Sequence, residues 1–154
     1  MRLAGCPAGW LSWDFSVVAE GGGSLADVTV DWLADAGRFT LAGVPYTMSR
    51  EGILSGDFLL RREAAVLAAA TKESAFRRQF RIRGEGRELT LAAAGPLTNR
   101  FVLIEADAEV GSIAPDRWLS WHSAADLPDS LSPPFRVFLL WLAYLMWRRE
   151  ASGE

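Results

Sequence analysis

Apolar and polar residues alternate along much of the chain from residue 10 to about residue 124. Trp13, Phe15 and Val17 are separated by polar residues, and the pattern recurs over Val28–Trp32. A period of two is typical of a β-strand with one buried face. The sequence predicts further strands at Arg38–Leu41, Tyr46–Ser49, Asp57–Arg61, Ala64–Ala70, Ala75–Arg83, Glu88–Ala93, Arg100–Glu105, Glu109–Ile113 and Trp118–Ser123.

Glycine and proline separate these predicted strands. Glycine adopts positive φ and proline cannot donate to a strand ladder, so both residues mark turns. Roughly eleven or twelve short strands at a spacing near ten residues predict an antiparallel barrel or sandwich. The turn positions are Gly21–Ser24, Asp35–Gly37, Gly43–Pro45, Gly84–Gly86, Gly95–Pro96 and Pro115–Asp116.

The segment Val137–Trp147 is apolar without interruption and predicts a helix over residues 135–149. Pro133 and Pro134 suit the start of a helix, and Arg148 and Arg149 suit its C-terminal end. A helix that is apolar on all sides must be buried on all sides. The run rises about 16 Å, which is short of a bilayer core of about 30 Å. We therefore predict a mainly β fold, a closed antiparallel barrel of about twelve strands threaded by this buried helix, and not a membrane span.

The chain of 154 residues suits one domain. We expect an N-terminal extension at residues 1–9, the barrel at 10–149 and a polar tail at 150–154. A net charge of −3 gives no basic footprint for nucleic acid. Cys6 is the only cysteine, and the lipoprotein-like box Leu3–Cys6 lacks the apolar stretch that a secretion signal needs before its cleavage site. We therefore expect a cytoplasmic protein, with a peripheral membrane location left open.

Four stretches carry a resemblance to a known fold family: Gly56–Leu60, Lys72–Phe80, Val110–Ile113, and Phe138–Leu142 with Trp147–Arg149. Together with the barrel-and-helix order, they resemble small bacterial members of the tubby C-terminal-like fold, which includes tubby proteins, phospholipid scramblases and the LURP-one-related family. The resemblance covers about residues 10 to 149. It implies a twelve-stranded closed barrel around a C-terminal helix. Tubby domains bind phosphoinositides through basic side chains on the barrel. Scramblases are linked to lipid movement and calcium, but the sequence contains no EF-hand calcium loop.

A basic cluster at Lys72, Arg77, Arg78, Arg81 and Arg83 is the strongest candidate binding site. Alternation along the predicted strand places Arg77, Arg81 and Arg83 on an outer face, where they could hold an anionic head group. The alternative is an ordinary solvated strand face. Alternation assigns Arg78 to the apolar face, so either a bulge redirects it or a carboxylate pairs with it there, and we favour the bulge.

His122 is the only histidine, with Ser120, Ser123 and Asp126 near it in the sequence. A general base needs an oriented partner and a nucleophile within reach, and neighbours along one strand do not provide that geometry. One histidine and one cysteine cannot supply a typical zinc site. We predict no catalytic residues, no metal and no cofactor.

Three functional hypotheses remain. The first is a non-enzymatic barrel module that binds an anionic ligand, such as a phospholipid head group, at an outer basic face. The alternative is a structural or protein-interaction domain without a small-molecule ligand. The second alternative is a small hydrolase that uses His122.

Overall fold

The chain folds as an antiparallel barrel of twelve strands with one C-terminal helix, as the sequence predicts. The structure is a computed structural model that describes residues 1–7, 14–31, 33–52, 56–72, 77–117, 120–151 and 153, without the side chains of residues 117, 120 and 121. The strands are β1 (Arg2–Pro7), β2 (Phe15–Ala19), β3 (Ser24–Asp31), β4 (Ala36–Leu41), β5 (Val44–Glu51), β6 (Asp57–Arg62), β7 (Ala65–Thr71), β8 (Gln79–Gly84), β9 (Arg87–Ala93), β10 (Phe101–Glu105), β11 (Ala108–Arg117) and β12 (Ser120–Asp126).

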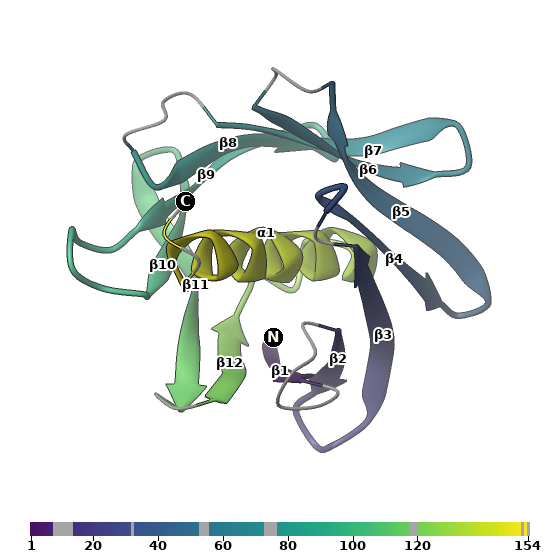
Figure 1. Ribbon diagram of the computed structural model, residues 1–154, viewed down its shortest axis with the longest axis horizontal. Helices are drawn as coiled ribbons and strands as arrows, with labels where there is room; N and C mark the ends of the chain where they lie inside the picture. The colour runs from purple at the N-terminus through teal and green to yellow at the C-terminus, as the bar shows by residue number, and fades with distance from the viewer. Residues whose placement is uncertain are drawn as a thin grey trace.

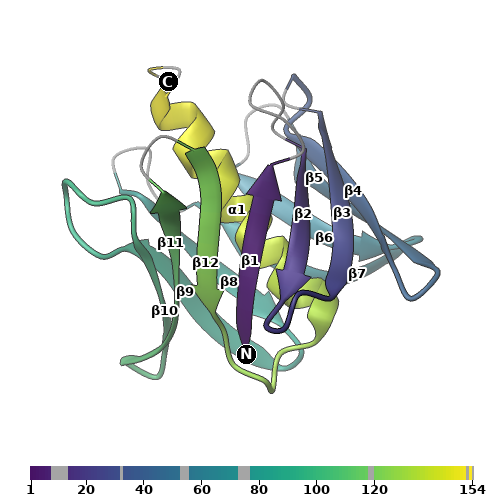
Figure 2. The same cartoon turned by 90° about the horizontal axis from the view of Figure 1, so that it is seen from below.

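Strand β1 closes the barrel. Each strand pairs with its sequence neighbours, and β1 pairs with β2 on one side and with β12 on the other. Figure 2 shows β1 between these two strands. The expectation that residues 1–9 form an extension is therefore wrong for Arg2–Pro7. Leu3 and Gly5 are the buried residues of β1. One leucine and one glycine are too short an apolar pattern to predict a strand from the sequence.

Helix α1 (Pro133–Ala151) fills the barrel, which confirms the prediction of a buried plug. Every residue from Pro134 to Trp147 is buried, and Figure 1 shows the strands wrapped around the helix. The helix continues to Ala151, so the first part of the expected tail at 150–154 is helical. Among the described residues, no helix is long and apolar enough to cross a membrane.

Aromatic side chains join the helix to the barrel wall. The Phe15 ring stacks on Tyr144 with centroids 4.2 Å apart, and the Phe58 ring meets Trp141 edge-on at 5.7 Å. Inward residues of the strands alternate with exposed ones, as the period of two predicts. Of the seven Trp residues, Trp141 and Trp147 are buried in the core, and the side chains of the other five lie outside the described residues.

The two mouths of the barrel differ in the segments that join the strands. At the N-terminal rim, where α1 begins, short turns such as Ala42–Gly43 and Glu85–Gly86 have positive φ at both residues, as tight hairpins require. At the C-terminal rim, where α1 ends, the described residues between strands include 33–35, 72, 77–78 and 94–100. The end of the helix therefore lies beside residues from three connections between strands.

Candidate functional site

Two loops of the C-terminal rim hold the last turn of α1. The Asp35 carboxylate, from the loop between β3 and β4, lies 3.1 Å from the Arg149 guanidinium. The Trp147 indole donates a hydrogen bond of 2.9 Å to the carbonyl of Asn99, from the loop between β9 and β10. These contacts fix both loops beside the end of the helix, so side chains distant in sequence meet at this rim.

Arg78 lies at this rim and faces the inside of the barrel. Its Nε forms an ion pair of 2.8 Å with a carboxylate oxygen of Glu150 on α1, and its Nη2 donates a hydrogen bond to the carbonyl of Thr98. Its guanidinium carbon lies 5.8 Å from the centre of the Phe101 ring, a cation–π contact. The Ala93 N–H donates a hydrogen bond of 2.9 Å to the Arg78 carbonyl, which continues the unshifted register of β8 with β9 to Arg78. The favoured bulge is therefore wrong, and the alternative, a carboxylate partner on the inner side, describes Arg78.

Lys72 is half-buried at the end of β7. Its backbone N–H donates to the carbonyl of Gly56, which holds the lysine against the neighbouring loop. Burial lowers the pKa of Lys72, the positive charge of Arg149 lowers this pKa further, and Glu150 opposes the shift. Among the described residues, no carboxylate lies within ion-pair distance of the Lys72 ammonium. Lys72 is thus a cation in a partly desolvated and electropositive position.

Charged side chains of both signs gather around the end of α1. Arg50 and Arg149 both approach the same Oδ2 of Asp35, at 3.2 Å and 3.1 Å. Glu150 pairs with Arg78. Lys72 lies beside these side chains, where the charge of Arg149 acts on it more strongly than that of Glu150. The surroundings of this lysine are therefore electropositive, although the whole chain has a net charge of −3.

The predicted basic cluster divides between the rim and the barrel wall. Lys72 and Arg78 belong to the rim, and Arg77 is exposed beside them. Arg81 and Arg83 point outward from β8, and both approach the exposed carboxylate of Glu88 at 3.5 Å and 3.8 Å. Exposed ion pairs of this kind contribute little to stability. This part of the predicted cluster is therefore consistent with an ordinary solvated strand face. The residues Glu73–Phe76 of the predicted strand lie outside the described residues.

Two leucines project from the loops that hold the helix. Leu33 is two residues before Asp35, and Leu97 is two residues before Asn99. Each is 99% exposed, more than the other large apolar side chains that the structure describes. The sequence does not single them out, because an isolated leucine in a loop carries no periodic signal. Their shared position on one rim appears only when the barrel brings the two loops together.

His122 does not form a catalytic pair with Ser123 or Asp126. Ser123 is buried and points inward, where its hydroxyl lies 3.3 Å from the Tyr144 hydroxyl. Adjacent residues of a strand face opposite sides, so His122 points outward. Asp126 is four residues further along β12, or about 13 Å at the rise of a strand. The side chain of Ser120 lies outside the described residues. In the part of the chain that the structure describes, no three His, Cys, Asp or Glu side chains gather as metal ligands.

Comparison of the chain with family models, with curated proteins and with solved structures gives no match. The resemblance to the tubby C-terminal-like fold therefore stays a prediction at the level of family. The barrel with its central helix is observed directly.

Proposed function

We propose that the protein is a non-enzymatic barrel module that binds an anionic phospholipid surface through its C-terminal rim. The observation that carries the proposal is the position of Lys72, which is half-buried near Arg149 and has no carboxylate within ion-pair distance among the described residues. A bound phosphate would place a negative charge beside the Lys72 ammonium and so favour its charged form. The proposed site moves from the outer row on β8, where Arg81 and Arg83 approach Glu88, to the rim around Lys72.

The two exposed leucines support a membrane surface over a dissolved anion as the partner. Leu33 and Leu97 flank the cationic centre of the rim and have no apolar contact that hides them from water. An apolar side chain that enters the boundary of a bilayer leaves water, and nearby cations are attracted to anionic lipids. Both effects act on the same face of the molecule. The end of the barrel, rather than its wall, would therefore face the membrane.

Vesicle co-sedimentation tests this proposal. The protein is mixed with vesicles of phosphatidylcholine alone or of phosphatidylcholine with phosphatidylserine, at low and at high salt. We expect binding to the mixed vesicles only, and weaker binding at high salt, because screening reduces attraction between charges. Lys72→Gln should weaken binding about fivefold, since each cation near an anionic surface contributes about 1 kcal/mol.

Arg83→Gln is the matched control, because it removes the same charge from the wall of β8. The rim proposal predicts little change for Arg83→Gln. A larger loss for Arg83→Gln than for Lys72→Gln would place the site on the wall. Absence of binding to the mixed vesicles at low salt would contradict the proposed function altogether.

A further inference from the structure

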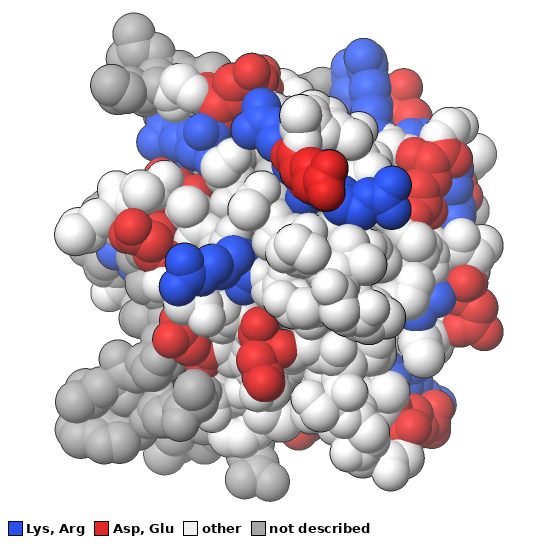
Figure 3. All heavy atoms as spheres, turned by 90° about the vertical axis from the view of Figure 1, so that its right-hand side faces the viewer, with Lys and Arg blue, Asp and Glu red and all other residues white. Residues whose placement is uncertain are grey.

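The outer face of β3, β4 and β5 is hollowed away from the rim cations. Two adjoining cavities of about 470 Å³ and 360 Å³ lie on it and share Thr29, Arg38 and Thr47. These strands lie on the right-hand side of Figure 1, and Figure 3 shows that side as a mostly uncharged surface with scattered basic and acidic side chains. We call this hollow the β4 trough, after its central strand.

Close packing of β4 on the helix accounts for the hollow. A Cβ atom at Gly37 would lie 3.0 Å from the Trp141 indole nitrogen and 3.0 Å from the Met48 methyl group. Only a residue without a side chain allows the strand to approach the helix so closely. On the outer side of the sheet, Ala36 adds only a methyl group. The outer surface at this position of β4 is therefore recessed between β3 and β5.

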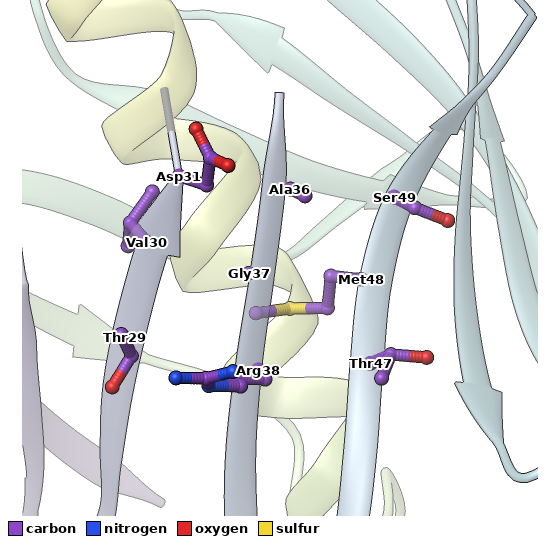
Figure 4. A pocket seen from close by; sticks show the side chains of 9 residues that line it. All are labelled: Thr29, Val30, Asp31, Ala36, Gly37, Arg38, Thr47, Met48 and Ser49. Atoms are coloured by element: carbon purple, nitrogen blue, oxygen red, sulfur yellow. The ribbon is translucent and has the colours of Figure 1, made fainter. Parts of the chain in front are cut away.

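Strand register arranges polar side chains in rows across the trough. Arg38 pairs with Thr29 on one side and with Thr47 on the other, and Figure 4 shows its guanidinium extended towards Thr29. One row nearer the C-terminal rim, Ala36 lies between Asp31 and Ser49. Figure 4 shows the two rows side by side on the three strands.

The nearby carboxylates are engaged with other groups. Asp31 accepts hydrogen bonds from the backbone N–H groups of Leu33 and Ala34, at 3.1 Å and 3.3 Å. Asp27 accepts a hydrogen bond from the Ser16 hydroxyl. Arg38 is exposed, and among the described residues no carboxylate forms an ion pair with it. The trough therefore presents one guanidinium whose charge the fold does not use.

We infer that the β4 trough binds a small hydroxylated organic anion, such as a phosphate monoester of a polyol. A guanidinium holds a phosphate or carboxylate through two parallel hydrogen bonds. The Thr29 hydroxyl, on the side to which the guanidinium extends, would donate to a remaining oxygen of that group. The polyol part would lie over Ala36, with the Ser49 hydroxyl and the free oxygen of Asp31 at its edge. A volume of about 470 Å³ falls within the range of small-molecule sites.

NMR titration with glycerol 3-phosphate and, separately, with inorganic phosphate tests this site. We expect both probes to shift the backbone amide signals of Gly37, Arg38 and Thr47. Arg38→Gln should lower the affinity for both probes about tenfold, as expected for the loss of a charged hydrogen-bonding partner. Ala36→Leu should fill the part of the trough that the polyol would occupy. It should therefore lower the affinity for glycerol 3-phosphate and leave the affinity for inorganic phosphate unchanged.

Arg83→Gln serves again as the control, because it removes an exposed arginine from another part of the wall and should leave both affinities unchanged. Equal binding by the protein and by Arg38→Gln would overturn the inference, as would the absence of shifts with either probe. Arg38→Gln should also bind mixed vesicles as the unmodified protein does. The proposed trough site and the proposed membrane binding by the rim can therefore be refuted independently.

Discussion

The two tryptophans of α1 should respond differently to the same substitution. Both indoles are buried, but the Trp147 N–H donates to the carbonyl of Asn99, whereas the Trp141 N–H has no hydrogen-bond partner among the described groups. Replacement by Phe removes part of the ring at both positions and keeps an aromatic side chain. The comparison therefore isolates the role of the indole N–H.

The magnitudes follow from the two environments. Lost packing should cost about 1–2 kcal/mol for either Trp→Phe change. Trp147→Phe also loses a hydrogen bond, worth about 1 kcal/mol, so its total cost is about 2–3 kcal/mol. Trp141→Phe removes a buried N–H group without a partner, and the relief of about 1–3 kcal/mol offsets the lost packing. Its stability should stay close to that of the unmodified protein.

Thermal unfolding followed by circular dichroism measures the difference. For a domain of this size, 1 kcal/mol shifts Tm by about 2–4 °C, so Trp147→Phe should unfold roughly 5–10 °C below Trp141→Phe. An equal or larger loss for Trp141→Phe would refute the reasoning. It would mean that the Trp141 N–H is satisfied in solution or that packing at the centre of the helix dominates.

Three further predictions concern stability. Gly5→Ala should lower the free energy of unfolding by about 1–3 kcal/mol, because its Cβ would lie 2.6 Å from the Tyr144 hydroxyl. Gly23→Ala is the matched control, because the added atom meets nothing within 4 Å. Equal urea midpoints for the two variants would contradict the close packing at Gly5. Burial raises the pKa of Tyr144 to about 12, above the value of about 10 in an unfolded chain. The native state then keeps this proton more tightly, so stability should fall between about pH 10 and pH 12, and Tyr144→Phe should lose less in urea titrations across that range. Lys72→Met should raise stability at neutral pH by a few tenths of a kcal/mol, because burial and Arg149 lower the pKa of this lysine and disfavour its charge. This gain should shrink as the pH rises through the lowered pKa, and a loss of stability at neutral pH would show that Lys72 is well compensated.

Periodicity predicted the fold because it depends on local alternation. The outward position of Arg81 and the inward positions of Phe80 and Ile82 follow from a period of two, and the length and uniform hydrophobicity of Val137–Trp147 predicted the plug. Periodicity does not predict strand β1, because its inward residues include Gly5, which carries no apolar side chain. Its place in the barrel depends on pairing with β12, more than a hundred residues away.

The candidate site was predicted only in part. The sequence indicates a cationic segment at Lys72–Arg83, and its alternation assigns Arg78 to the apolar face. It could not show that Glu150 would reach Arg78 or that Asp35 would be shared by Arg50 and Arg149, because these contacts depend on where the helix leaves the barrel. The β4 trough likewise depends on how closely Gly37 approaches Trp141, a distance that no local pattern encodes.

An environment-sensitive fluorophore at each rim tests most directly whether the C-terminal rim faces a membrane. Cys6→Ser removes the only native thiol, and a single cysteine is then placed by Leu97→Cys or, at the opposite rim, by Val66→Cys. With vesicles that contain phosphatidylserine, the label at position 97 should shift to the blue and the label at position 66 should not. A blue shift at position 66 alone, or at neither position while the protein sediments with the vesicles, would contradict the proposed orientation.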